Sequence, residues 1–327
     1  FAADFCHWFP QSARLSRPTP LLRESSASEP LCCSLLGPDQ GTGCAASSGA
    51  SRSASPPPEE ALLLQMELGD PRAAVWTGVA WNGGELLLNP ALHLARLRRH
   101  APRLGIALPE DLVQQLSAAL AILERPADPL RVEGQAPYLI RAGVLADGSL
   151  SLKPSVPIQW PTEPLIAVSE SATTEWPPGV AGTKHGHWTP YVAARNAAKA
   201  RGAHVALLFG RDADGDEFLC DGDRCAPLVL GADGSCCYPL HEEGALDSVT
   251  LEALKPALEA AGFRVCGRRI RRSELIAASE VLVIGSGMGV RAIGSLDGVA
   301  LGSSAAAPRS PRPLHRAAWA AWLDALK

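Results

Sequence analysis

The sequence predicts an α+β fold built in two parts. Short apolar runs typical of strands, such as 204–209, are interspersed with amphipathic runs typical of helices, such as 249–262. The 327 residues, 46% of them hydrophobic, suffice for one large domain or two moderate ones. A proline-rich stretch at 153–180 separates the two parts, and no internal repeat is evident.

Residues 1–69 are expected to lie outside this fold, as a disordered extension or a transit segment. Within 1–60, Ser, Ala and Pro are abundant and no apolar periodicity is present, so too little surface can be buried to offset the ordering entropy. A composition rich in Ser and Arg is also typical of a transit peptide, although six acidic residues argue against one. A mistranslated upstream region is a third alternative. Because the chain begins with Phe1 rather than Met, we interpret it as a fragment or a processed product.

The smaller N-terminal domain is expected at 70–152. A strand at 73–81 should turn at Asn82-Gly83-Gly84 into a second strand, because Asn-Gly between apolar runs is a hairpin signal. The further elements are a helix with Leu92, Ala95 and Arg99 on one face and Leu94, Leu97 and Ala101 near the next, a helix at 109–124 with Pro109 in its first turn, and two strands around Asp147-Gly148.

The range 153–180 is expected to be the interdomain linker, with one strand at 164–170, and the larger C-terminal domain is expected at 181–327. Thr189 should cap a helix in which Pro190 occupies the first position. The remaining elements are strands at 204–209, 217–220 and near 227–230, a helix at 249–262, a short helix and strands within 273–301, and a final helix at 313–327.

Charge and cysteine usage exclude several classes of protein. A net charge of -4 and a pI near 6.1 give no basic field for nucleic acid or an anionic membrane. No apolar run approaches the ~20 residues that span a bilayer. The nine cysteines are odd in number and include two adjacent pairs, which indicates reduced thiols in an intracellular protein. Cys220, Cys225, Cys236 and Cys237 could be drawn as a zinc cluster, but their spacing matches no common ligand pattern, so no metal site is expected.

Lys184 is the strongest candidate for chemistry. The chain has only five lysines, and Lys184 stands in "AGTKHGHW", between an apolar run and a predicted helix. A lysine with a depressed pKa is a nucleophile that forms Schiff bases with carbonyl compounds. Gly182 and Gly186 would give the backbone freedom at this junction. The alternative is a surface lysine on a loop.

Three other motifs are weaker. The glycines of "GSGMG" at 285–289 are followed by a predicted strand rather than a helix, which argues against a dinucleotide fingerprint but leaves a turn that could hold a phosphate. "RDADGDEF" at 211–218 resembles the opening of a calcium loop, yet Glu217 stands where glycine is needed, so a hairpin turn is expected. His185 and His187 could bind a metal, but without a third ligand we interpret them as polar residues in the wall of an active site.

Taken together, these segments resemble the class IV aminotransferases, the pyridoxal-phosphate enzymes of fold type IV. The resemblance covers roughly 74–327 and depends on the order of three blocks: "NGGELLLNPALHLARL", "GTKHGHWTPYVAARNAAKARGA" and "SELIAASEVLVIGSGMGVRAIGSLDG". It implies two α/β domains with the cofactor site between them, and two subunits paired as a homodimer. The family includes branched-chain and D-amino acid aminotransferases and 4-amino-4-deoxychorismate lyase.

The resemblance also assigns residues. It implies Lys184 as the Schiff-base lysine and the base that moves the substrate's α-proton. It implies that the cofactor phosphate is bound by Arg96 of "HLARL", by the start of the helix at Val249 and Thr250, and by the turn at Ser286 and Gly287. Asp221 falls where the family has the glutamate that pairs with the pyridine nitrogen.

The sequence departs from the family pattern at several of these positions. Asp221 is shorter than the expected glutamate, and Asp223, Cys225 and Ala226 replace the serines and asparagine that follow. Trp188 stands where the family often has a tyrosine four residues after the lysine, and Tyr191 is a candidate substitute. Ser248 and Leu251 replace the glycine and arginine that flank the family's "GIT" helix start.

Three functions are therefore compatible with the sequence. The first is an aminotransferase acting on a small amino acid and a 2-oxo acid, with an arginine such as Arg141 binding a substrate carboxylate. The second is a lyase that releases pyruvate from aminodeoxychorismate with the same cofactor. The third is a non-catalytic relative, which the altered run after Asp221 favours. A transit segment would indicate a plastid or mitochondrial protein, and its absence a cytoplasmic one.

Overall fold

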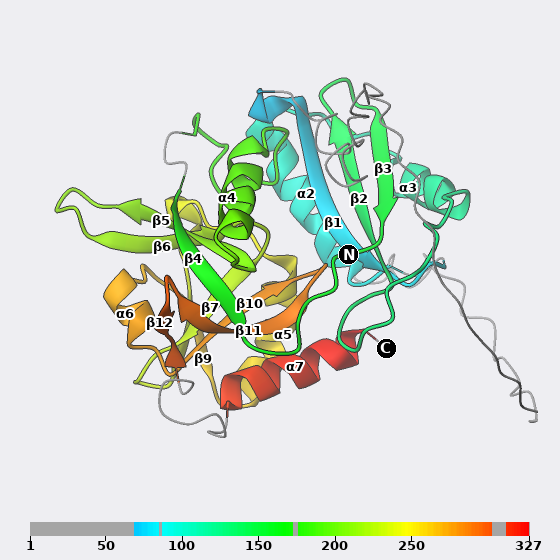
Figure 1. Cartoon of the computed structure of the whole chain (residues 1–327). Coiled ribbons are helices and arrows are strands. Elements are labelled where there is room, and N and C mark those ends of the chain that lie inside the picture. Colours follow the sequence, from blue (N-terminus) through cyan, green and yellow to red (C-terminus); the bar gives the residue numbers. More distant parts are fainter. Residues whose placement is uncertain (1–68, 85–86, 173–175, 303–311, 327) are drawn as a thin grey trace, which may run out of the picture. The chain divides into compact units, whose positions relative to one another are not determined.

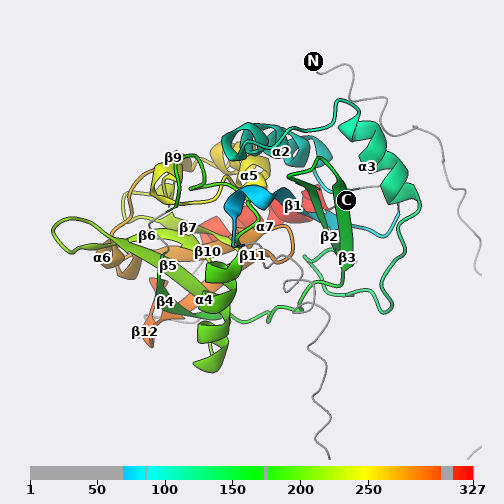
Figure 2. The same ribbon diagram turned by 90° about the horizontal axis from the view of Figure 1, so that it is seen from above.

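The computed structural model describes residues 69–84, 87–172, 176–302 and 312–326. These residues form two β-sheets with helices around them (Figure 1), which confirms the α+β prediction. The described residues belong to one compact unit, and the smaller sheet lies beside the larger one in both Figure 1 and Figure 2. The predictions made for residues 1–68 lie outside the described residues.

The smaller sheet has three antiparallel strands in the order β1 (Ala74–Trp81), β2 (Tyr138–Leu145) and β3 (Leu150–Ser155). The turn at Asp147-Gly148 joins β2 to β3 as predicted, with the Asp147 carboxylate accepting the Ser149 N–H. The helix α2 (Pro90–Leu104) packs against β1 and buries Leu94, Leu97 and Ala101. Leu92, Ala95 and Arg99 lie on its more exposed side.

The second strand of the hairpin predicted at Asn82-Gly83-Gly84 lies partly outside the described residues, which omit 85–86. Among the residues described there, Leu87 forms a bridge with Trp81, and the Leu88 N–H donates to the Ala80 carbonyl. β2 pairs along the whole of one edge of β1, and the other edge is bridged near its start by His185. That leaves only the end of β1 for a local return strand.

Two helix starts also differ from the predictions. The helix predicted at 109–124 is α3 (Leu112–Ala121). Pro109 lies before it in a turn, where its carbonyl accepts the Leu112 N–H. The helix α4 (Thr189–Ala200) is capped by Trp188, so Thr189 is its first residue rather than its cap. Pro190 still lies in the first turn, where a missing N–H breaks no helical bond.

The larger sheet has nine strands, in the order β6-β5-β4-β11-β10-β7-β8-β9, with β12 paired to β11. Three pairs are parallel (β4 with β5, β4 with β11, β8 with β9), and the other pairs of this sheet are antiparallel. The strands are β4 (Leu165–Ser171), β5 (Val205–Arg211), β6 (Glu217–Gly222), β7 (Ala226–Leu230), β8 (Ser235–Tyr238), β9 (Arg264–Gly267), β10 (Glu280–Gly285), β11 (Gly289–Leu296) and β12 (Val299–Ala300). The strand β4 falls in the range expected as linker, and the domain boundaries stay predictions.

The remaining helices are α5 (Val249–Ala260), α6 (Arg272–Ile276) and α7 (Pro313–Ala325), and two short 3₁₀ turns lie at Pro71–Ala73 (η1) and His241–Glu243 (η2). The segment at 211–218 is the hairpin between β5 and β6, as predicted. The glycine turn at 285–289 joins the antiparallel strands β10 and β11, so no helix follows it, also as predicted.

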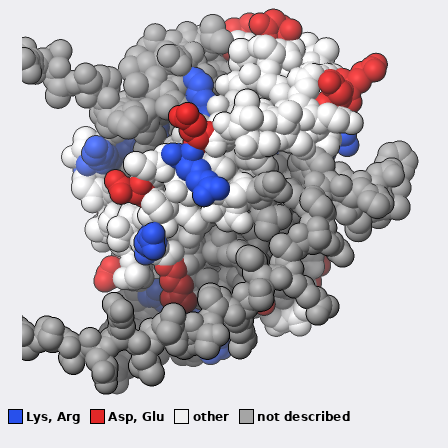
Figure 3. All heavy atoms as spheres, turned by 90° about the vertical axis from the view of Figure 1, so that its right-hand side faces the viewer, with Lys and Arg blue, Asp and Glu red and all other residues white. Residues whose placement is uncertain are grey.

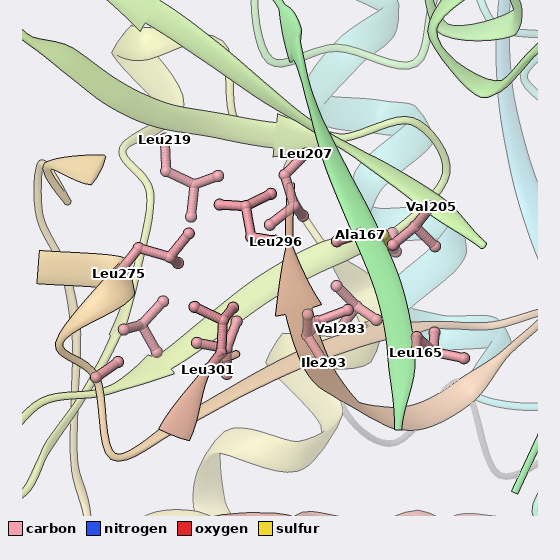
Figure 4. Packing of buried hydrophobic residues seen from close by; sticks show 14 of the residues in the cluster. Leu165, Ala167, Val205, Leu207, Leu219, Leu275, Val283, Ile293, Leu296 and Leu301 are labelled. Carbon is pink, nitrogen blue, oxygen red and sulfur yellow. The ribbon is translucent and has the colours of Figure 1, made fainter. Parts of the chain in front are cut away.

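Alternating side chains on the strands build separate cores on the two faces of the larger sheet. On β5, Leu207 enters one cluster and Leu208 the opposite one under α4, as the period of two in a strand requires. Figure 4 shows residues of the first cluster. Seven strands that are neighbours in the sheet contribute to this cluster, namely β6, β5, β4, β11, β10, β7 and β8, so the sheet curls around it. A further cluster joins the sheet to α5 and α7 and includes the buried Trp322.

Among the described residues, no helix is long and apolar enough to cross a membrane. On the face shown in Figure 3, basic and acidic side chains are interspersed over the described atoms. That part of the surface therefore presents no extended field of one sign.

Candidate active site

Lys184 is held between the smaller sheet and α2 by its own backbone. Its carbonyl accepts the Trp76 N–H of β1 at 3.1 Å, and its N–H donates to Nδ1 of His100 on α2 at 3.1 Å. Gly182 before it has φ +72°, a conformation that favours glycine, as the sequence suggested. Gly186 is needed for space rather than for φ, because a Cβ there would lie 2.9 Å from the Asp70 carbonyl oxygen.

The Lys184 side chain lies among aromatic rings. Its Nζ is 4.1 Å from the ring centroid of Trp76 and 4.4 Å from that of Trp188. Burial lowers the pKa of Lys184 well below its ordinary value, and the charges of Arg96 and Arg141 lower it further, whereas Asp221 opposes them. A lysine in this environment carries more of the neutral, nucleophilic amine at neutral pH.

Arg96 and the start of α5 form a candidate anion site. Arg96 is 4% exposed and donates from Nη1 to the Asp247 carbonyl at 2.9 Å and from Nη2 to the Thr77 hydroxyl. Its Nε is buried and has no hydrogen-bond partner in the described part of the chain. Val249 and Thr250 are buried in the first turn of α5, where backbone N–H groups have no partner within the helix. An unpaired guanidinium N–H beside a helix N-terminus is suited to an anion.

Ser286 and Gly287 lie in the turn between β10 and β11. The Gly287 carbonyl accepts the side-chain N–H of Gln135 at 3.0 Å, and a Cβ at Gly287 would lie 3.4 Å from Leu139 of β2. The turn therefore lies against the smaller sheet. Within the described residues, no hydrogen bond joins it to Arg96.

Asp221 is a buried carboxylate near Lys184. It lies on β6 beside an irregularity in the pairing with β5, and its side chain accepts the Leu246 N–H at 3.2 Å. Burial raises the pKa of Asp221 to about 7, against the opposing effects of the Gly222 and Leu246 N–H groups and of Lys184. A carboxyl group with this pKa is ready to ionise when a cationic partner enters the site.

Further aromatic side chains pack around the rings that contact the Lys184 amine. Tyr191 points inward from α4 and stacks on Trp188 with 4.0 Å between ring centroids. Trp176 contacts the rings of both His185 and His187, at 4.5 and 5.6 Å between centroids. Burial, together with the charges of His187 and Lys184, lowers the pKa of His185 to about 3.

Among the described residues, no three His, Cys, Asp or Glu side chains gather as they would around a metal ion.

A polar layer lies behind the lysine, and of its members only Arg96 was predicted. His93, Arg96 and His100 are all buried on the inner face of α2, and Thr77 on β1 is 2.6 Å from Nδ1 of His93. Asp247 closes the layer, because its carboxylate accepts from Arg99 at 2.8 Å and lies 3.5 Å from Nε2 of His100. The spacing of 93, 96 and 100 along one helix face was the available signal.

Asp247 therefore connects the parts of the site. Its carbonyl holds Arg96, its side chain faces His100, and its N–H donates to Gly182 at 3.4 Å, two residues before Lys184. The next residue, Ser248, caps α5 by accepting the Leu251 N–H. The arginine, the lysine loop and the helix N-terminus are thus fixed relative to one another.

Comparison with known proteins gives consistent matches. Residues 74–296 match the family model described as amino-transferase class IV. Among solved structures, the chain is similar to a putative 4-amino-4-deoxychorismate lyase at 27% identity, over 73% of this chain and 88% of that one, with a TM-score of 0.55. It is also similar to branched-chain aminotransferases from Thermoproteus uzoniensis (20% identity, 78% and 86% coverage, TM-score 0.60) and Escherichia coli (16%, 77% and 83%, 0.59). No curated protein sequence matches.

Proposed function

Because the chain belongs to the class IV aminotransferases, we propose that it is a pyridoxal-phosphate-dependent aminotransferase in which Lys184 binds the cofactor covalently. The observation that carries the proposal is the Lys184 amine, held with a lowered pKa close to the buried carboxyl group of Asp221. The fold and the family are those of enzymes that transfer or eliminate groups from amino acids.

The residues present fit this cofactor. The unpaired Nε of Arg96 and the first turn of α5, at Val249 and Thr250, would hold its phosphate, and Ser286 and Gly287 are proposed to complete that site. Asp221 would pair with the pyridine nitrogen, because a protonated nitrogen there would supply the cation that the buried carboxyl group lacks. Its shorter side chain, relative to the family's glutamate, is therefore compatible with the role.

Pyridoxal phosphate, when bound, supplies an electron sink that stabilises negative charge at the α-carbon of an amino acid. The protein then has to move one proton and orient one carboxylate. Lys184 Nζ is the group proposed to accept and return the α-proton, because its lowered pKa favours the neutral amine. Arg141 is proposed to bind the substrate carboxylate, because its guanidinium lies 4.2 Å from the Trp76 ring that Lys184 Nζ also contacts.

The test is an absorption spectrum of the purified protein with pyridoxal phosphate added, followed by borohydride reduction. We expect a visible band that borohydride removes, with the cofactor then attached to the Lys184 peptide in a mass spectrum. The Lys184→Ala variant should lack both, and Lys199→Ala, an exposed lysine on α4, should retain both. A wild type that stays colourless would refute the proposal and support a non-catalytic relative.

A lyase is the second candidate, since the 27%-identical neighbour is titled a putative 4-amino-4-deoxychorismate lyase. Amino-group transfer converts an added 2-oxo acid to its amino acid, whereas the lyase releases pyruvate from aminodeoxychorismate without a second substrate. Assaying both products separates the two. A homodimer is proposed from family membership, and light scattering of the purified protein tests it.

A further inference from the structure

Two thiols face each other across neighbouring strands at the edge of the larger sheet. Cys237 of β8 is paired in register with Cys266 of the parallel strand β9. Their sulfur atoms are 3.7 Å apart. Neighbouring strands lie about 4.8 Å apart, which is inside the range of Cα separations of about 4.4–6.8 Å that disulfides bridge. Closing the bond therefore requires side-chain rotation and no rearrangement of the sheet.

The two sulfurs differ in their surroundings. Cys237 is fully buried, and its sulfur accepts the Nε–H of Arg268 at 3.1 Å and lies 3.3 Å from the Ser235 hydroxyl. Arg268 is itself held by Glu274 at 2.8 Å. Cys266 is only partly buried, so a small reagent can reach it. The Cys266 thiol is accessible, whereas the Cys237 thiol lies beside the Arg268 guanidinium, which can stabilise negative charge on its sulfur.

The other described cysteines lack this arrangement. Cys220, Cys225 and Cys236 are buried, and no second pair of sulfur atoms among the described residues is in contact. Cys236 is adjacent to Cys237 in sequence but packs into the cluster under α5 and α7, on the opposite face of the sheet. The Cys237–Cys266 pair is thus distinct in its geometry.

We propose that Cys237 and Cys266 form a thiol–disulfide exchange site whose reaction partner is a small disulfide of the glutathione type. The Cys266 thiolate attacks one sulfur of the small disulfide, and the first thiol leaves with the proton from Cys266. The Cys237 sulfur then attacks the Cys266 sulfur of the mixed disulfide, and the second thiol leaves with the proton from Cys237. The two protein thiols are oxidised to one disulfide, and the small disulfide is reduced to two thiols.

Arg268 acts in the second step, by stabilising negative charge on Cys237 as it attacks. The first step is expected to be slow at neutral pH, because burial and the neighbouring Cys237 raise the pKa of Cys266. Incubations of hours rather than minutes are therefore appropriate. The proposal does not depend on the proposed enzymatic function, since it involves none of the residues assigned to the cofactor.

The test is incubation of the full-length protein with oxidised glutathione, followed by alkylation and peptide mapping without reductant. We expect a cross-linked peptide containing Cys237 and Cys266. The Cys237→Ser variant should stop at a glutathione adduct on Cys266, and Cys266→Ser should leave Cys237 unmodified. Cys236→Ser is the matched control and should form the cross-link like the wild type.

Arg268→Gln should accumulate the mixed disulfide at Cys266 before the cross-link forms, which a solely structural role of this arginine would not cause. Thermal melting of each variant checks that it is folded. Failure of the wild type to form the cross-link would overturn the proposal, as would modification confined to the cysteines at positions 6, 32, 33 and 44.

Discussion

Replacing Asp221 by Asn is expected to make the cofactor-free protein more stable. Asp221 is 4% exposed, and its pKa is raised from 3.8 to about 7. The folded state therefore binds a proton more tightly than the unfolded chain, so this group destabilises the fold as pH rises from about 4 through about 7. At about 1.4 kcal/mol for each pH unit, the full penalty above pH 7 is about 4 kcal/mol.

An asparagine at 221 carries no charge and keeps an oxygen for the Leu246 N–H. We expect the variant to exceed the wild type by about 2–4 kcal/mol at pH 8, because the new amide N–H groups cancel part of the gain. At pH 5 most of the folded-state Asp221 is protonated, so the difference should shrink by about 2–3 kcal/mol.

The assay is urea denaturation of protein freed of pyridoxal phosphate, at pH 5, 6, 7 and 8. The exposed Asp214 provides the matched control, and Asp214→Asn should change the free energy of unfolding by no more than about 0.5 kcal/mol. An Asp221→Asn variant that is less stable than the wild type at pH 8 would refute the reasoning. A stability difference that does not change with pH would refute it as well.

Three further outcomes are expected. Trp322→Ala should lower the free energy of unfolding by about 3–5 kcal/mol, because this buried ring fills the cluster under α7 and its Nε1–H donates to a backbone carbonyl at 2.8 Å; urea denaturation measures it. Gly289→Ala should cost at least about 2 kcal/mol more than Gly298→Ala in the same assay, because both have positive φ but only at Gly289 would a Cβ meet backbone, 2.4 Å away; equal costs would contradict the packing argument. Arg96→Gln should weaken binding of pyridoxal phosphate by roughly 10–100-fold, because hydrogen bonds to a charged group contribute about 1.5–3 kcal/mol. Binding of unphosphorylated pyridoxal, measured by the same titration, should change little, because it has no phosphate for Arg96 to bind.

Most of the elements could be predicted from local sequence patterns. The apolar runs at 204–209 and 227–230 are strands, and the pattern at 249–262 is a helix. These elements could be predicted because the spacing of apolar residues along each segment reflects the face that enters the core. The pairing of β1 could not be predicted, since its edges contact strands and loops from far along the chain. Such long-range pairing leaves no local signal.

The site could be predicted only in part. Lys184 was predicted from its residue type and context, and Arg96 from the resemblance to the family. The charge of Arg96 lowers the pKa of Lys184, so the two lie near each other, and their roles stay predictions. His100 and Asp247 were missed because their partners outside their own segments are 65 residues away or more, so these contacts are visible only in the fold. Trp76 was missed for the same reason, since its contact with Lys184 joins residues 108 positions apart.

The order of strands in the larger sheet has a consequence for synthesis of the chain. β4 pairs with β5 on one side, but its other neighbour, β11, begins more than a hundred residues later. While the ribosome translates the intervening segment, the edge of β4 that will pair with β11 has unpaired backbone N–H and C=O groups. These groups can pair with other nascent chains. The sheet cannot be completed until the chain is nearly finished, so growth temperature and chaperone supply should govern its yield in expression more than any single stabilising contact.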